Sequence, residues 1–364
     1  MDKFELNERG MYHAILGGYE KALEFFDKAI ELDPQFEGAW FNKALVLKEL
    51  GKFDKAIKCF EKIIALNPTS ILAWFNKGLI YKDIGEFDKA LECFDKVIAL
   101  DPEEKAAWFN KGLTLSYLGE TERAIECYNE ASKLDPSDIF SLFNKGVALR
   151  ELGNYKSAIE CYDKVLEIDP WDIEALNNKG NLLLLLHDSK GADECYDKVL
   201  ELDPTNVLAW YNKGLILEDQ GKLEEAIELY DKSLSFDSNN IDALFSKGVA
   251  LNKLGKFEDA IECFDEVIKL NPKNKNAWNN KGAILYELGD LKRALECFER
   301  TLKIDPILEE AQFNKEKVEN ELNEWSQTFF IKVIELIFIL HKELYFKWFN
   351  YSKFFELLDN LMCK

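Results

Sequence analysis

The chain contains few of the residues from which most active sites are built. It has three histidines among 364 residues, so a catalytic triad or a histidine metal cluster has little material. No two cysteines have the short C-x-x-C spacing of a zinc site, and no glycine-rich phosphate loop is present. The sequence therefore predicts no catalytic residue, no metal site and no cofactor, and we expect the protein not to be an enzyme.

The chain also lacks an excess of basic residues and any long apolar segment. Its formal net charge is −21, and an acidic surface disfavours a nucleic-acid partner because binding phosphates needs a basic stripe. The opening residues, MDKFELNERG, contain no apolar run typical of a secretory signal. No segment reaches the roughly 18 uncharged apolar residues that a membrane-spanning helix needs. We therefore expect a soluble cytoplasmic protein.

Prolines are sparse too, and all of them lie on one evenly spaced grid: Pro34, Pro68, Pro102, Pro136, Pro170, Pro204, Pro272 and Pro306. Ser238 fills the one position of this grid that has no proline. A fixed period of this length indicates an array of repeats instead of one globular core. When each repeat is counted so that its proline is position 32, nine repeats run from residue 3 to residue 308 without insertion or deletion.

Other residue types recur in phase with the prolines. Position 20 is Ala and position 24 is Phe or Tyr in all nine repeats, position 4 is Trp or Leu, and positions 8 and 15 are each Gly in eight repeats. Positions 4, 8 and 11 lie on one face of a helix, and positions 20, 24 and 27 on one face of a second helix. Gly at position 15 and Pro at position 32 end these helices. Each repeat is therefore predicted to be a helical hairpin that neighbouring repeats cover.

This order of aromatic, Gly, Ala, aromatic and Pro resembles the tetratricopeptide-repeat (TPR) family over about five sixths of the chain. The resemblance implies an all-α fold, a right-handed superhelical solenoid of TPR helical hairpins with a C-terminal capping helix and an apolar helical tail. We expect nine TPR repeats (3–308), the capping helix (309–323) and an aromatic-rich helical tail (324–364). Because TPR proteins bind peptides in a concave groove lined by the first helices, the implied function is a protein–protein interaction scaffold for extended peptide segments.

The first helices carry a second pattern on the face away from their buried stripe. Position 6 is mostly Asn, whose acceptor and donors complement a peptide backbone, and position 5 is mostly aromatic, which is typical of recognition surfaces. This looks like the asparagine ladder of O-linked N-acetylglucosamine transferase TPR superhelices, here without a catalytic domain. The predicted peptide-binding residues are Asn42, Asn76, Asn110, Asn144, Asn178, Asn212, Asn280, Phe41, Phe75, Phe109, Phe143, Tyr211, Leu184 and Leu185.

Each part of this surface has a structural alternative that the sequence leaves open. The asparagines could satisfy backbone groups of their own helix, and the rings at position 5 could pack against the neighbouring repeat. Leu184 and Leu185, at positions 12 and 13, either anchor a partner or fill space against an adjacent repeat. A carboxylate clamp of the co-chaperone type is not expected, because position 9 carries Asn only at Asn181.

Lysines and cysteines also follow the repeat. Lys occupies position 7 in every repeat after the first, and we expect its stem to cover the apolar face while its amine reaches water. Seven of the eight cysteines occupy position 23, too far apart in successive hairpins for disulfides. We expect all thiols, including that of Cys363, to be free.

The tail is rich in aromatic residues and differs in composition from the repeats. Its apolar residues recur at helical spacings, which predicts one or two helices with a broad apolar face. We expect this face to pack on the end of the array or on a second copy, giving a homo-oligomer through residues 324–364. Attachment to a membrane surface is a less favoured alternative. The residues of this face are Phe330, Val333, Ile337, Leu340, Leu344, Trp348, Phe355 and Leu358.

Overall fold

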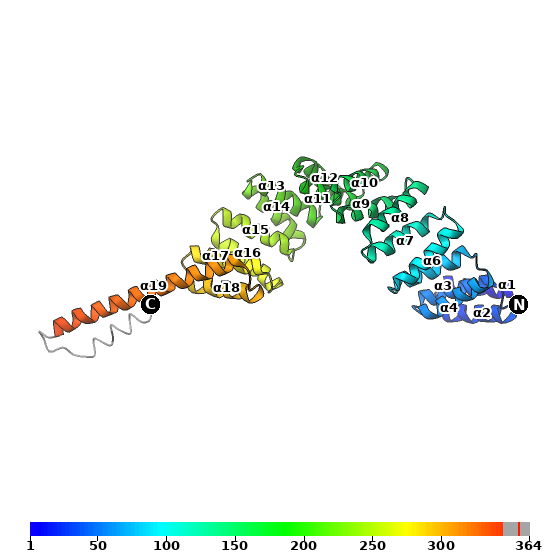
Figure 1. Cartoon of the computed structure of the whole chain (residues 1–364), viewed down its shortest axis with the longest axis horizontal. Coiled ribbons are helices and arrows are strands. Elements are labelled where there is room, and N and C mark those ends of the chain that lie inside the picture. Colours follow the sequence, from blue (N-terminus) through cyan, green and yellow to red (C-terminus); the bar gives the residue numbers. More distant parts are fainter. Residues whose placement is uncertain (345–355, 357–364) are drawn as a thin grey trace. The chain divides into compact units, whose positions relative to one another are not determined.

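The computed structural model describes residues 1–344 and residue 356, and within these ranges all regular secondary structure is helical (Figure 1). The chain divides into two compact units, of which the first ends at Pro204 and the second begins at Thr205. The helices of the first unit are α1 (Lys3–Ile15), α2 (Tyr19–Leu32), α3 (Glu37–Glu49), α4 (Phe53–Leu66), α5 (Ile71–Asp83), α6 (Phe87–Leu100), α7 (Lys105–Tyr117), α8 (Thr121–Leu134), α9 (Ile139–Glu151), α10 (Tyr155–Ile168), α11 (Ile173–Leu185) and α12 (Ser189–Leu202).

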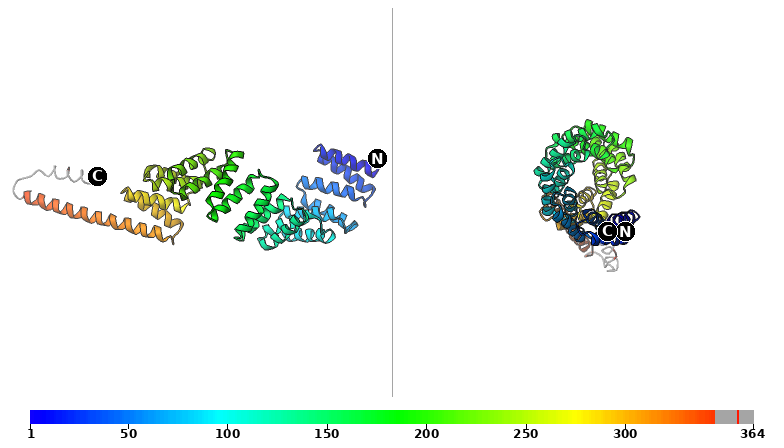
Figure 2. Two further views of the ribbon diagram at one scale, coloured as in Figure 1. Left: turned by 90° about the horizontal axis from the view of Figure 1, so that it is seen from above. Right: turned by 90° about the vertical axis from the view of Figure 1, so that its right-hand side faces the viewer.

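The helices of the second unit are α13 (Val207–Asp219), α14 (Leu223–Phe236), α15 (Ile241–Lys253), α16 (Phe257–Leu270), α17 (Lys275–Glu287), α18 (Leu291–Ile304) and α19 (Glu309–Leu344). In each of the nine repeats the first, odd-numbered helix covers positions 1–13 and the second covers positions 17–30. The hairpins follow one another in chain order within each unit (Figure 2). The predicted array of tandem helical hairpins is therefore confirmed.

The turn inside each hairpin depends on a left-handed residue at position 15. The glycines there have φ between 68° and 80°, a conformation that costs Gly little because it has no Cβ. His187 takes the same conformation with φ of 62°, so the one repeat without this glycine keeps the turn with a strained residue. The second helix ends where the chain becomes extended ahead of the proline, since a residue before proline avoids the α conformation.

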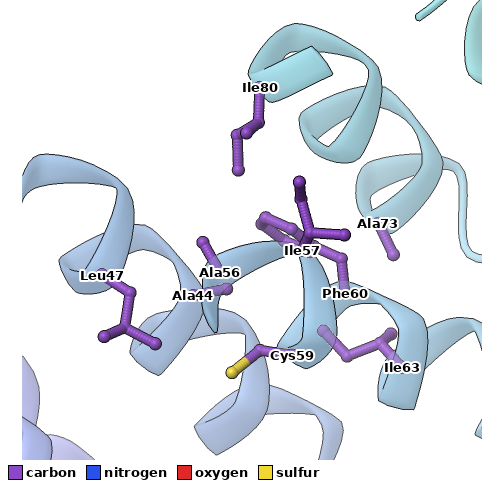
Figure 3. Close-up of a cluster of buried hydrophobic side chains, with 9 residues drawn as sticks. All are labelled: Ala44, Leu47, Ala56, Ile57, Cys59, Phe60, Ile63, Ala73 and Ile80. Atoms are coloured by element: carbon purple, nitrogen blue, oxygen red, sulfur yellow. The ribbon is translucent and has the colours of Figure 1, made fainter. Parts of the chain in front are cut away.

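Two recurring residues set the distance between the helices of a hairpin. The aromatic ring at position 24 is fully buried and lies against the glycine at position 8. A Cβ added to Gly214 would lie 2.5 Å from Cε1 of Tyr230, so a side chain there would push the two helices of this repeat apart. The second repeat accommodates Ala44 at this position beside the ring of Phe60. Figure 3 shows the cluster around Phe60, in which Ala73 and Ile80 come from α5 of the next repeat. The core is therefore shared between successive repeats.

The lysines at position 7 correct one expectation. Instead of reaching water, the amine of seven of them pairs with the carboxylate at position 25 of the preceding repeat. The pair therefore joins the second helix of one repeat to the first helix of the next. The pairs are Lys43–Asp27, Lys77–Glu61 (3.1 Å), Lys111–Asp95 (2.6 Å), Lys179–Asp163 (2.6 Å), Lys247–Asp231 (2.6 Å), Lys281–Asp265 and Lys315–Glu299 (3.9 Å).

The cysteines at position 23 are free and buried, as predicted, while Cys363 lies outside the described residues. Burial raises the pKa of the Cys59 and Cys127 thiols to about 11, because a thiolate loses its hydration in an apolar setting. These thiols are therefore protonated and unreactive in the folded chain. The described residues contain no group of three or more His, Cys, Asp or Glu side chains arranged to hold a metal ion.

Helix α19 begins as the first helix of a tenth repeat and then continues beyond the array. Ala311 and Val318 are buried, and Val318 and Leu322 pack in a cluster with Phe298 of α18. The helix runs without interruption through the boundary expected at residues 323 and 324. Beyond it, large apolar side chains from Trp325 onward are exposed. Of the predicted apolar face, Trp348, Phe355 and Leu358 lie outside the described residues.

Candidate peptide-binding face

Consecutive first helices approach one another within each unit. In the first unit α5 contacts α7 and α7 contacts α9, and in the second unit α13 contacts α15 and α15 contacts α17. Their outward sides therefore form one surface in each unit. We call this surface the ladder face and define it by positions 5, 6, 9, 12 and 13 of the first helices.

The asparagines at position 6 bond to their own helix, which was the alternative role left open by the sequence. In four repeats the side-chain amide nitrogen donates to the backbone carbonyl four residues earlier. This bond fixes the rotamer of the side chain, but it uses only one of the two amide hydrogens. The bonds join Asn76 to Leu72 (2.9 Å), Asn110 to Ala106 (2.9 Å), Asn144 to Phe140 (2.8 Å) and Asn178 to Glu174 (2.8 Å).

The side-chain carbonyl groups divide these asparagines into two kinds. Oδ1 of Asn110 accepts a hydrogen bond from Nζ of Lys82 at 2.8 Å, and Oδ1 of Asn178 accepts one from Nη1 of Arg150 at 3.1 Å. Asn110 is also buried. By contrast, Oδ1 of Asn76 and of Asn144 accepts no hydrogen bond within the described part of the chain. These two amides are oriented by their helix while their carbonyl oxygens stay available.

The second repeat differs from this pattern, because Nδ2 of Asn42 donates to Oδ1 of Asn7 at 3.0 Å. In the second unit, Asn212 and Asn280 lie at the equivalent position of α13 and α17 and are half-buried. The predicted asparagines thus share one position on the ladder face but differ in their hydrogen bonds.

Lys82 and Arg150 are ladder-face residues that the sequence reasoning missed. Both occupy position 12, and each reaches the asparagine of the following repeat. Burial lowers the pKa of the Lys82 ammonium, because the charged form loses hydration. A basic residue at position 12 with Asn at position 6 of the next repeat is not a sufficient signal, because Lys48 has the same relation to Asn76 and pairs with Asp83 instead. Asp83 and Glu151, at position 13, follow Lys82 and Arg150 directly in the ladder face.

The aromatic residues at position 5 pack against a ring of their own repeat, and Phe109 also lies 6.4 Å from the ring of Phe140 in the next repeat. Phe41 meets the ring of Phe60 edge-on, with centroids 5.8 Å apart, and Tyr211 lies 5.9 Å from Tyr230. Each ring is half-buried, so its remaining edge lies at the surface beside the asparagine. The sequence left open whether these rings form a recognition surface or pack against the neighbouring repeat, and in the structure the aromatic at position 24 of the same repeat covers one side of each. The other pairs are Phe75–Phe94, Phe109–Tyr128 and Phe143–Tyr162.

The two leucines at the end of α11 form a small apolar area on the ladder face. Leu185 is 58% exposed, whereas Leu184 is half-buried. In the equivalent place other repeats present charged residues such as Lys48 and Glu49. The structure therefore puts one of the two predicted leucines fully at the surface.

Tyrosine hydroxyls at position 24 reach the underside of the ladder face. Tyr230 donates to Oε2 of Glu218 at 2.7 Å, and Tyr196 donates to Oδ1 of Asn181 at 2.6 Å. The hydroxyl of Tyr162 is buried and has no hydrogen-bond partner within the described residues. Burial raises the pKa of the Tyr162 hydroxyl to about 12. The same side chain therefore meets different surroundings in different repeats.

Comparison with known families agrees with the hairpin geometry. Profiles described as tetratricopeptide repeat or TPR repeat match residues 4–36, 38–70, 71–104, 106–138, 139–172, 173–206, 195–228, 214–255 and 245–306. The chain belongs to the tetratricopeptide-repeat family. An uncharacterized protein of Methanocaldococcus jannaschii is 65% identical to this TPR protein over 34 residues, which are 9% of this chain and 40% of the relative. The match thus spans less than half of the relative's length.

Solved structures share the fold. A tetratricopeptide repeat protein from Parabacteroides merdae has a TM-score of 0.54 and 20% identity, with 69% of this chain and 99% of that chain covered. PilF of Pseudomonas aeruginosa has a TM-score of 0.52 and 22% identity, with 58% and 97% covered. At these identities the likeness shows the TPR fold alone. TPR proteins bind protein or peptide partners, and the repeats support a role as a protein–protein interaction scaffold.

Proposed function

We propose that this TPR protein is a scaffold that binds extended peptide segments of partner proteins along the ladder face. The observation that carries the proposal is the geometry of Asn76 and Asn144. Each amide is held by its own helix and keeps a carbonyl oxygen and an amide hydrogen for another molecule. A peptide backbone presents the complementary N–H and C=O groups, and groups that are already oriented lose little entropy on binding.

The neighbouring residues supply the remaining contacts in this proposal. The half-buried rings of Phe75 and Phe143 offer rigid apolar edges beside the asparagines. Lys82 and Arg150 hold Asn110 and Asn178 in place. Leu185 accepts an apolar side chain of the partner. The proposed ligand is therefore an extended segment with apolar residues, and Asn212 and Asn280 lie at the equivalent position in the second unit.

A cytoplasmic location belongs to the same proposal. The seven cysteines at position 23 are buried and form no disulfide, and many free cysteines are typical of proteins in a reducing compartment.

The test uses a peptide selected from an immobilised library by the full chain. Replacing both Asn76 and Asn144 by Ala removes two hydrogen-bonding groups and should weaken binding by about 1–3 kcal/mol, roughly 5- to 150-fold, from about 0.5–1.5 kcal/mol per bond. Fluorescence anisotropy of the labelled peptide measures the affinity. Asn154→Ala, in the turn before α10, is the matched control and should leave the affinity unchanged. Unchanged affinity of the double variant together with a large loss of stability would assign these asparagines to the fold.

Self-association through α19 is a second candidate function. The observation that favours it is a row of exposed apolar side chains on the second half of this helix, formed by Phe330, Ile334 and Phe338. Apolar surface of this kind marks an interaction site or causes aggregation. Within the described residues, no helix combines the length and apolar content needed to cross a membrane.

Deletion of residues 324–364 tests this candidate. If α19 joins two copies, light scattering of the deletion variant should give the mass of a single chain, while the full chain gives twice its mass. An unchanged mass combined with loss of binding to liposomes would favour a peripheral membrane adaptor instead.

A further inference from the structure

A cavity of about 940 Å³ opens between the fourth and fifth repeats, within the first unit. Its walls come from α7, α8, α9 and α10, and its lining residues occupy positions other than those that define the ladder face. The volume lies within the range of about 300–1,000 Å³ that is typical of small-molecule sites. This cavity is therefore separate from the proposed peptide-binding face.

Two lining residues depart from the repeat pattern, and a third is the smaller of the two side chains usual at its position. Asn129 occupies position 25, where the other eight repeats carry Asp or Glu. Ser132 occupies position 28, where the other eight carry Ile or Leu. Leu142 occupies position 4, where the three preceding repeats carry Trp. Relative to the other repeats, Asn129 removes a negative charge from the cavity wall, and the smaller side chains of Ser132 and Leu142 leave space there.

The loss of the acid leaves Lys145 without its usual counter-ion. In seven other repeats the equivalent lysine pairs with the residue at position 25, for example Lys111 with Asp95 at 2.6 Å. Lys145 is half-buried and forms no ion pair within the described residues. A partly desolvated ammonium without a counter-ion is unfavourable. It therefore favours the binding of an anion.

The Ser132 hydroxyl strengthens the same conclusion. The residue lines the cavity, while its hydroxyl oxygen is shielded from solvent and has no hydrogen-bond partner among the described residues. Rotation about the Cα–Cβ bond to another staggered rotamer presents this oxygen to a ligand. A buried donor without a partner is costly, and a charged acceptor would satisfy it with a strong, charge-assisted bond.

Two cations in the cavity wall form no ion pair within the described residues. The lining contains five basic and three acidic side chains, but Lys111 pairs with Asp95, Arg123 with Glu120 and Lys133 with Glu130, which leaves Lys145 and Lys164. The basic residues are Lys111, Arg123, Lys133, Lys145 and Lys164. Trp108, Leu115, Leu142 and Ile168 add apolar wall. The basic side chains and the apolar side chains of this lining together complement a molecule with one anionic group and an apolar body.

We propose that this cavity is a binding site for a small organic anion, whose phosphate or carboxylate group pairs with Lys145 and accepts a hydrogen bond from Ser132. The apolar part of the ligand lies against Leu142 and Trp108. The proposal does not depend on peptide binding at the ladder face, since it uses different residues.

The test is isothermal titration calorimetry of the full chain with two probes, inorganic phosphate and citrate, at constant ionic strength in chloride buffer. At least one probe should bind saturably with one site per chain, and the probe that binds more tightly identifies the anionic group as phosphate or carboxylate. Asn129→Asp gives Lys145 the counter-ion that most other repeats have. The variant chain should therefore fold normally and bind the probe at least tenfold more weakly. Ser132→Ile restores the side chain of the other repeats and should also abolish binding.

The matched control is Asp265→Asn, which frees Lys281 at the equivalent place in the second unit, where Ile268 occupies position 28. This variant should gain no second site for either probe. Three results would each overturn the proposal: no saturable binding of either probe, undiminished binding by the Asn129→Asp chain, or a new site in the Asp265→Asn chain.

Discussion

Removing one hydroxyl from two equivalent tyrosines should change stability in opposite directions. Tyr162 and Tyr230 both occupy position 24, and both side chains are fully buried. The Tyr230 hydroxyl donates to Glu218, whose other oxygen accepts a bond from Lys253 at 2.9 Å. The Tyr162 hydroxyl has no partner within the described residues. The repeats therefore provide two equivalent tyrosines that differ mainly in whether the hydroxyl has a hydrogen-bond partner.

The magnitudes follow from these surroundings. Tyr230→Phe removes a bond to a charged group and should destabilise the second unit by about 1.5–3 kcal/mol, whereas Tyr162→Phe removes an unsatisfied hydroxyl and should stabilise the first unit by about 1 kcal/mol. The two substitutions should therefore differ by about 2.5–4 kcal/mol although they delete the same atom.

Because repeats of a solenoid open separately, the assay must be local. Hydrogen exchange of the α10 and α14 backbone amides reports the free energy of opening at each site. Faster exchange in α14 of the Tyr230→Phe chain and slower exchange in α10 of the Tyr162→Phe chain is the expected result. Equal losses at both sites would refute the reasoning, since they would show that the hydroxyl is not what distinguishes the two repeats.

Two further predictions concern close contact and pH. Gly214→Ala should destabilise the chain by about 1–3 kcal/mol, measured by urea unfolding, because the added Cβ would meet the Tyr230 ring at 2.5 Å. Hydrogen bonds from Lys105 and Ser137 lower the pKa of Asp135 from 3.8 to about 2. Because the folded-state pKa is the lower one, the stabilisation is complete above about pH 4 and is lost as pH falls toward 2. Lys105→Met should raise this pKa toward 3.8 in an NMR titration, and an unchanged value would contradict the assignment of its cause.

The sequence was sufficient to predict the helical hairpins because the same residue pattern recurs in nine repeats, so each repeat independently supports the same helix ends. Gly at position 15 and Pro at position 32 predicted where helices end, and His187 shows that the turn persists when the glycine is replaced. The ladder-face position of the asparagines followed from helical periodicity. Their hydrogen bonds did not, since the choice between Leu72 and a ligand as the partner of Asn76 depends on the rotamer.

Contacts between repeats were harder to predict than contacts within one. The partner of Lys43 is Asp27, which lies across a turn and in the preceding repeat, so the lysine alone gave no indication of it. The half-buried rings, such as Phe41 against Phe60, were judged from their own helix without the second helix that covers them. Residues after Leu322 have no repeated copy for comparison, so their helical periodicity predicted one or two helices with an apolar face but did not decide between packing on the end of the array and packing on a second copy.

The pairing of position 7 with position 25 also makes the array tolerant of changes in length. The two charges of each pair belong to different repeats, but every repeat has the same length. Excising one whole period anywhere between residues 3 and 308 therefore joins a repeat to a new neighbour, which again supplies the missing charge unless it is the repeat that carries Asn129. The cut does not need to fall at a turn. A gene encoding this chain can thus gain or lose whole periods at arbitrary points while its interfaces keep their electrostatic match.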